Sequence, residues 1–246
     1  MNYYYLVERD YSKPSWAVSE VSNIRKTLPK HFPNPALPPA INSFFSLLPY
    51  QKMPLKTQYM SIACKTCGRY DDDAIFDLGF SDPVTIRIKV DFAHTDDRVF
   101  AVNQKFLDVL RKGKVEGFET KPLGSSGWHA IRVIERVDCD ESVMKLIGPF
   151  CKECGRPEQI PGIFTKLEEL SLPSRSNVIF TTKTGLAKPY RDRTTFLTED
   201  VVILLKEAGI KGGWCHRLWT REEVDKMDEK AKQGNKWKPK GAVITL

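Results

Sequence analysis

The chain has no long apolar run: within its 246 residues nothing approaches the roughly 20 consecutive apolar residues of a membrane-spanning helix. The first ten residues, MNYYYLVERD, also lack the basic stretch, apolar core and small-residue cleavage site of a secretory signal. We therefore expect a cytoplasmic protein. In a reducing compartment, its 6 cysteines favour metal ligation over disulfides.

The motifs of common catalytic centres are missing as well. Only 4 histidines occur and none stands in H-E-x-x-H, and there is no G-x-S-x-G and no phosphate-binding glycine loop. Cys215-His216 is the one adjacent pair of nucleophile and base, but neighbours on a strand point to opposite faces. The sequence therefore predicts a binding scaffold and not an enzyme.

What the sequence does contain is a repeated short motif. It reads C-x-x-C-G at residues 64–68 and again at 151–155, with 87 residues between the two starts (64 to 151). Two thiolates on one tight turn supply half of a tetrahedral zinc site, and two such turns supply a closed, structural Cys₄ site. We predict one structural Zn²⁺ bound by Cys64, Cys67, Cys151 and Cys154.

Other readings of these cysteines stay open. Each motif can be a redox pair, although a thioredoxin-type C-x-x-C opens a helix, whereas residues 68–73 indicate a turn. The thiols can also be free of metal. The three aspartates at 71–73 suggest a calcium site, but such a run is more typical of a solvated turn. Cys139 and Cys215 receive no role.

Local patterns predict short elements separated by turns. Proline-rich residues 10–58 disfavour long helices and indicate an ordered wrapping segment. Asn103, Thr198 and the capping box Thr220–Glu223 mark three helix starts. We expect helices over 102–113, 198–209 and 220–233, and strands over 2–7, 59–63, 84–90, 115–119, 129–134, 178–182 and 210–214.

Two of the helix units correspond at a constant offset of 95 residues. Asn103 corresponds to Thr198, Leu107 to Val202, and the glycine at 117 to that at 212. The offset between the cysteine motifs is 87, so an insertion of eight residues would reconcile the two values. We therefore predict an internal duplication of knuckle, strand, helix and strand. Chance similarity of two ordinary helix-to-strand units is the alternative.

The expected fold class is α+β: mixed sheets with a few helices, in two pseudo-repeated halves joined by a Cys₄ zinc-ribbon-like knuckle pair. We expect one compact domain made of four segments: a wrapping segment (1–58), two knuckle-containing halves (59–147 and 148–219), and a C-terminal helix with a basic tail (220–246).

The paired motifs carry a family resemblance. The chain resembles the double-CXXCG-motif family, which includes immunity proteins of bacterial contact-dependent and polymorphic toxin systems. The likeness spans roughly residues 55–220 and leaves out the proline-rich segment and the basic tail. It rests on Cys64, Cys67, Gly68, Phe150, Cys151, Cys154, Gly155 and the helix-to-strand unit 198–214.

The resemblance implies a protein that binds a cognate toxin and blocks it by occlusion, with no catalytic step. Exposed aromatic and arginine side chains dominate many interfaces, which makes Trp214, Trp219, Trp237, Arg217 and Arg191 the candidate toxin contacts. The net charge of +7 lies toward the two ends of the chain and would speed capture of an acidic partner. The alternative is a zinc-ribbon protein that binds nucleic acid through those basic ends, including the tail around Trp237.

Overall fold

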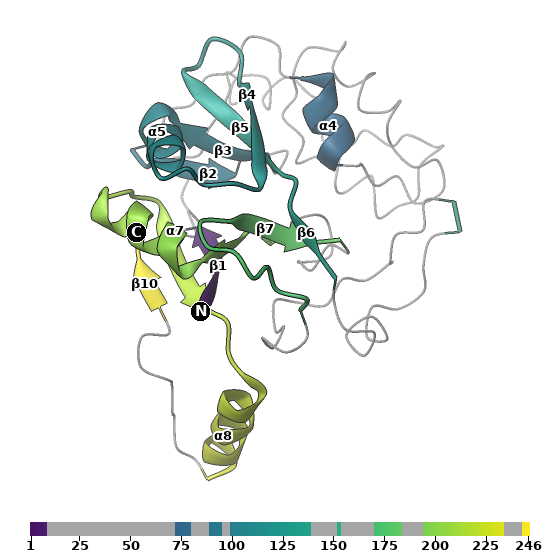
Figure 1. Ribbon diagram of the computed structural model, residues 1–246, viewed down its shortest axis with the longest axis vertical. Helices are drawn as coiled ribbons and strands as arrows, with labels where there is room; N and C mark the ends of the chain where they lie inside the picture. Colours follow the sequence, from purple (N-terminus) through teal and green to yellow (C-terminus); the bar gives the residue numbers. More distant parts are fainter. Residues whose placement is uncertain are drawn as a thin grey trace, which may run out of the picture.

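The computed structural model describes residues 1–8, 72–79, 89–94, 99–138, 152–153, 170–183, 194–233 and 243–246. Within these ranges the protein is α+β, with two sheets, helices packed on them and one helix that projects away (Figure 1). The strands are β1 (Tyr3–Glu8), β2 (Phe92–His94), β3 (Phe100–Asn103), β4 (Phe118–Pro122), β5 (Trp128–Val133), β6 (Arg136–Val137), β7 (Ile179–Thr182), β8 (Phe196–Thr198), β9 (Gly213–Arg217) and β10 (Val243–Thr245). The helices are α4 (Asp72–Leu78), α5 (Gln104–Lys112), α7 (Glu199–Glu207) and α8 (Arg221–Lys232).

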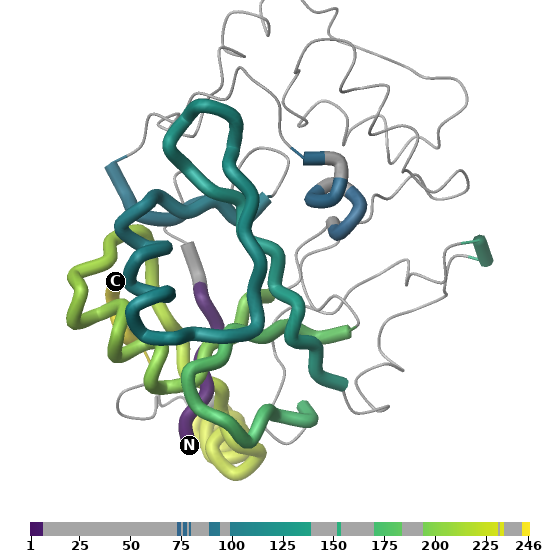
Figure 2. The backbone as a smooth tube through the Cα atoms, turned by 45° about the horizontal axis from the view of Figure 1, so that its top comes forward, coloured from purple at the N-terminus to yellow at the C-terminus, as the bar shows by residue number. Residues whose placement is uncertain are grey.

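The larger sheet has the strand order β10-β9-β1-β8-β7-β6, and the smaller has β2-β3-β5-β4. All pairs are antiparallel except β6 with β7. The N-terminal strand β1 therefore lies in the middle of the larger sheet, between β8 and β9 from the far end of the chain (Figure 2). This confirms the strand predicted over residues 2–7.

One apolar core joins both sheets. Its buried side chains come from β1, β2, β3, β5, β7, β8 and β9 and from the inward faces of α5 and α7. The two helices are amphipathic: Phe106, Leu107 and Leu110 on α5 and Val201 and Leu205 on α7 are fully buried, at the spacing of a helix face turned to the core. Both helices were predicted, and the structure confirms them.

The helix ends follow the predicted caps with two differences. The Asn103 side chain accepts a hydrogen bond from the Phe106 amide, as expected of an N-cap, but Thr198 caps α7 without such a bond. Its hydroxyl instead accepts from the buried Val178 amide at 3.1 Å. Gly113 ends α5 in a right-handed conformation, and the left-handed residue is Lys114, at φ 51°. A Cβ at 113 would lie 2.5 Å from Cδ1 of Leu204 on α7, so the Leu204 side chain would have to move to admit one.

Two predicted strands begin later than expected. The strands predicted over 115–119 and 210–214 are observed as β4 and β9, which start at Phe118 and Gly213. Each is preceded by a glycine with positive φ, Gly117 (89°) and Gly212 (156°), where the backbone departs from strand geometry. The turn before them accounts for the shift, while β5 and β7 agree with the predicted strands over 129–134 and 178–182.

The turn predicted over residues 68–73 is wrong at its end, because α4 begins at Asp72. Acidic residues are favourable in the first turn of a helix, and Asp73 pairs with Arg136. Phe76 fixes the helix to the smaller sheet, where it is buried with Leu123, Trp128 and two alanines. The segment predicted over 10–58 and the strand predicted over 59–63 lie outside the described residues. So does most of the strand predicted over 84–90, and its last two residues, which the structure describes, form a bend and not a strand.

Four strands of each sheet share an order and a register. β2-β3-β5-β4 of the smaller sheet, with α5, form what we call the first unit; β7-β8-β1-β9 of the larger sheet, with α7, form the second unit. The residue numbers of α7 and β9 are those of α5 and β4 plus 95, at both ends of each element. Those of β1 are the residue numbers of β5 minus 125. Asn103 pairs with Trp128, and the corresponding Thr198 pairs with Tyr3.

The correspondence extends to β2 and β7, at an offset of 87. Phe92 pairs with Val102 in the first unit, and Ile179 pairs with Leu197 in the second. The N-cap amides behave alike: Asn103 donates to the Asp91 carbonyl at 2.9 Å and Thr198 to the Val178 carbonyl at 3.1 Å. The two units also contact each other closely at their glycines. A Cβ at Gly117 of the first unit would overlap the Ile179 carbonyl of the second, and a Cβ at Gly212 of the second would lie 2.7 Å from the Phe92 ring of the first. Each unit therefore holds the other at an equivalent place.

Candidate partner-binding surface

The predicted zinc ligands cannot be placed. Cys64, Cys67, Cys151 and Cys154 lie outside the described residues, as does Cys139. Within the described ranges no group of three or more metal-ligating side chains occurs, but those ranges contain none of the four thiols. Cys215 is the cysteine that the structure describes; it is buried in the core, where desolvation raises the pKa of its thiol to about 12. An uncharged, enclosed thiol of this kind is inert.

Three of the five predicted partner contacts lie within one short stretch of the described chain. Trp214 and Arg217 are on β9, and Trp219 follows it in the segment that leads into α8. All three side chains are half-buried. Trp237 and Arg191 are not in the part of the chain that the structure describes, so their position relative to this group is open.

The outer face of β9 carries aromatic side chains. Cys215 points into the core, so the alternation of a strand turns Trp214 and His216 to the opposite face. His216 lies opposite Tyr5 of β1, and the two rings stack with centroids 5.1 Å apart and an interplanar angle of 19°. Burial raises the pKa of the Tyr5 hydroxyl, so the ring stays neutral well above pH 7. Trp214 lies on the same face of β9 as the His216–Tyr5 stack, and we call these three side chains the aromatic platform.

Arg217 has a partner within its own chain. Its guanidinium pairs with the Glu223 carboxylate, and both side chains are mostly shielded from solvent. Glu223 also accepts from the Thr220 amide at 3.0 Å, and its own amide donates to the Thr220 hydroxyl at 3.2 Å, which confirms the predicted capping box. Arg217 therefore positions α8, and its head group is less available to a partner than the sequence indicated.

These contacts set the charge state of Glu223. Burial alone raises the pKa of this carboxyl, but hydrogen bonds from Arg217 and Thr220 outweigh burial and hold its pKa below the usual value. The carboxylate is thus charged throughout the neutral range, and the link between β9 and α8 is intact there. The capping box is visible in the sequence, but the ion pair between its Glu223 and Arg217, three positions before it, is not.

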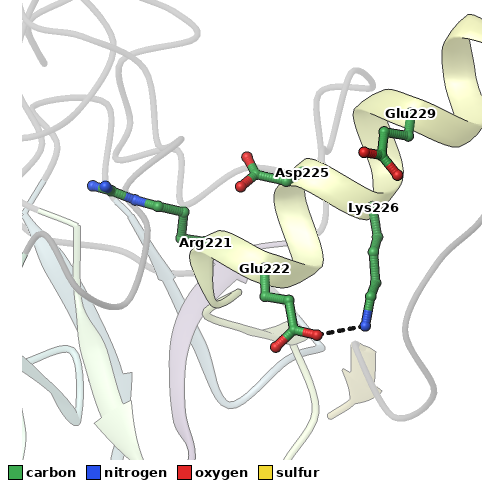
Figure 3. A pocket seen from close by; sticks show the side chains of 5 residues that line it. All are labelled: Arg221, Glu222, Asp225, Lys226 and Glu229. Atoms are coloured by element: carbon green, nitrogen blue, oxygen red, sulfur yellow. Dashed lines mark hydrogen bonds and ion pairs between the residues drawn. The ribbon is translucent and has the colours of Figure 1, made fainter.

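Helix α8 projects away from the two sheets and presents charge on most of its surface (Figure 1). Arg221, Glu222, Asp225, Lys226 and Glu229 lie along one side of it and line a shallow surface depression (Figure 3). Glu222 and Lys226 pair at 2.6 Å across one helical turn, a contact that raises the pKa of Lys226. The helix carries five acidic and four basic residues, REEVDKMDEKAK, so its charge is patterned and nearly balanced.

No protein-family model matches the chain, and no curated protein or solved structure matches it. None of the helices in the described ranges is long and apolar enough to cross a membrane.

Proposed function

We propose that this chain is an immunity protein, similar to those of the double-CXXCG-motif family, that binds and neutralises a cognate bacterial toxin by stoichiometric occlusion. The observation that carries the proposal is the attachment of α8 to the end of β9, whose outer face carries the aromatic platform of Trp214, His216 and Tyr5. The capping box and the Arg217–Glu223 pair fix the base of the helix on β9. A preorganised surface of aromatic and charged groups binds with little loss of conformational entropy.

The inhibitor acts by covering the toxin and needs no chemistry of its own. The platform supplies flat apolar contact area, and α8 supplies alternating charges that a partner of opposite pattern can match. Since α8 projects from the sheets, a toxin docked on the platform is contacted from two directions (Figure 1). Contact from two directions suits occlusion of an active site.

The scaffold beneath this surface is proposed to be a duplicated unit held by one shared structural zinc. The matched order, bounds and register of the first and second units support duplication. The cysteine motifs fit the same pattern: Cys64 precedes Phe92 by 28 residues, and Cys151 precedes the corresponding Ile179 by 28 (64 to 92, 151 to 179). Equal spacing from equivalent strands supports equivalent positions for the two knuckles, as a shared Cys₄ site requires.

Co-purification with the product of the adjacent gene tests the proposal. We expect a one-to-one complex at micromolar concentration that suppresses the toxic activity of the partner. Asp225→Lys on α8 weakens the complex at least tenfold, whereas Glu207→Lys, the same charge change at the exposed end of α7, leaves it unchanged.

Two results would contradict the proposal. One is that the pair never associates at micromolar concentration. The other is that the isolated chain binds unrelated nucleic acids at low salt, with affinity that falls steeply as salt rises, which is the behaviour of the nucleic-acid alternative.

A further inference from the structure

We propose that two copies of this chain associate through the free edge of β4 to form a two-fold symmetric dimer. Strand β4 ends the smaller sheet: it pairs with β5, and no described residue pairs with its other edge. Ile134 donates to the Gly117 carbonyl and Leu123 to the Trp128 carbonyl, both at 2.8 Å. Because hydrogen-bonded pairs alternate along an antiparallel ladder, the backbone groups of Phe118, Thr120 and Pro122 point outward from the sheet.

The second unit shows which kind of segment pairs with the equivalent strand edge. β9 corresponds to β4, and its outer edge is occupied by β10, an extended segment running antiparallel. The β9 residues that face β10 are Gly213, whose carbonyl accepts from Leu246 at 2.9 Å, and Cys215, which lies opposite Ile244. They correspond to Phe118 and Thr120 on β4. The same backbone geometry is therefore satisfied in the second unit, whereas no described residue satisfies it in the first.

The sequence of β4, FETKP, favours a second copy of the same strand as the occupant. Antiparallel pairing centred on Thr120 places this residue opposite itself, with both backbone bonds exchanged, and places Glu119 of each copy opposite Lys121 of the other. Opposite charges across a non-hydrogen-bonded pair stabilise a sheet. Glu119 is oriented by Arg132 at 2.5 Å. Lys121 of the second copy gives two of its three N–H groups to the Phe76 and Asp77 carbonyls of its own chain, at 2.9 and 3.1 Å, which leaves the third for this carboxylate.

Pro122 limits the pairing to this short register. It lies at an outward position and has no N–H, so it can accept from Phe118 of the second copy but cannot extend the ladder. The contact is self-complementary under a two-fold axis, because each copy contributes the same strand. The assembly therefore closes at two chains. In Figure 1 the β4–β5 hairpin and α8 are at opposite ends of the molecule, so the dimer leaves the α8 surface uncovered.

Sedimentation velocity of the full-length chain from about 5 µM to about 500 µM tests the dimer, since a short edge contact gives an affinity in the micromolar range. We expect the wild-type protein to shift from one chain to two over this range. Thr120→Pro removes the central N–H from each copy and weakens dimerisation at least about tenfold, while the bonds of β4 to β5, which use other residues, remain. Thr120→Val keeps the N–H and a similar shape, and it retains the dimer.

A covalent readout covers the case in which the proline variant folds poorly. Residues opposite each other in a hydrogen-bonded antiparallel pair lie about 5.5 Å apart at Cα, within disulfide range. Thr120→Cys should therefore give a disulfide-linked dimer on mild oxidation, through the loss of two electrons and two protons to the added oxidant. The proposal is overturned if the wild type stays a single chain up to about 500 µM, if Thr120→Pro associates as well as Thr120→Val, or if Thr120→Cys gives no more linked dimer than the wild type.

Discussion

Strands β4 and β9 occupy corresponding positions, but the chain completes their surroundings differently. On the first unit, α4 covers the outer face: Phe76 is buried on the sheet, and the Lys121 ammonium donates to the carbonyls of Phe76 and Asp77 at 2.9 and 3.1 Å. On the second unit the position of Lys121 is taken by His216, which stacks on Tyr5. The same frame thus carries a covered charged face on one side and an aromatic face on the other.

The difference shows which parts of the frame serve the core and which are free to vary. Backbone register, helix length and the glycines at 117 and 212 agree between the units, because these features place the apolar side chains of the shared core. The outer faces carry separate apolar clusters, one around Phe76 and Trp128 and one around Tyr3, Phe180 and Phe196, and there the units differ. The candidate surfaces for partners, on β9 with α8 and on the edge of β4, lie outside the shared core.

Loss of the proposed zinc should reduce the stability of the protein most, since the ion would join the equivalent knuckles of both units. Cys154→Ser is expected to release the metal and to cost several kcal/mol of folding free energy, because metal binding is coupled to folding. Cys139→Ser, outside both motifs, is the matched control and should keep one zinc per chain. Metal analysis and thermal unfolding measure both; an unchanged melting temperature for Cys154→Ser would exclude a shared structural ion.

Substitution of the two glycines at which the units contact each other, Gly117 and Gly212, should give the next largest loss of stability. Gly117→Ala adds a Cβ that overlaps the Ile179 carbonyl in a left-handed conformation, so we expect a loss of about 3 kcal/mol from strain and overlap together. Gly212→Ala meets the Phe92 ring at 2.7 Å and should cost a similar amount.

Gly127→Ala separates backbone strain from overlap. This turn glycine has φ 74° but no neighbour within 4 Å, so the variant should lose only about 1 kcal/mol, measured by urea unfolding. If Gly117→Ala and Gly212→Ala were no less stable than Gly127→Ala, the contacts between the units would not be tight.

Much of this frame could be predicted from the sequence because its signals are local. The N-cap Asn103, the spacing of Phe106, Leu107 and Leu110, and the capping box at 220 each specify a helix within a few residues. The 95-residue offset between the helix units was also visible, since corresponding turns need corresponding glycines.

The remainder depends on contacts between residues far apart in the chain. Nothing near residue 3 shows that β1 takes the place in the second unit that β5 holds in the first, because strand partners are chosen by long-range pairing. The acidic run at 71–73 resembles a turn until Arg136 and the sheet under Phe76 are in place. The candidate surface was seen only as single exposed tryptophans and arginines; its platform needs Tyr5 from the opposite end of the sequence.

The smallest expected effect concerns the attachment of α8, which the first unit lacks in the described residues. The pKa of Glu223 is lowered in the folded protein, so its contribution to stability is full above the carboxyl's unfolded pKa and is lost as pH falls through the lower, folded value. We expect the base of α8 to loosen only in acidic solution, below the usual glutamate pKa of 4.5. Glu223→Gln should remove this pH dependence and destabilise the helix by about 1 kcal/mol at neutral pH.

Amide hydrogen exchange in α8, followed from pH 7 to acid, measures this effect locally and separates it from unfolding of the sheets. Glu222→Gln is the matched control: it removes a carboxylate from the same helical turn, but one that pairs only with the exposed Lys226. Its protection at neutral pH should stay within about 0.5 kcal/mol of wild type. Equal loss of protection in both variants would mean that the Arg217–Glu223 contact does not hold the helix, and the preorganisation that distinguishes this end of the molecule would have no structural basis.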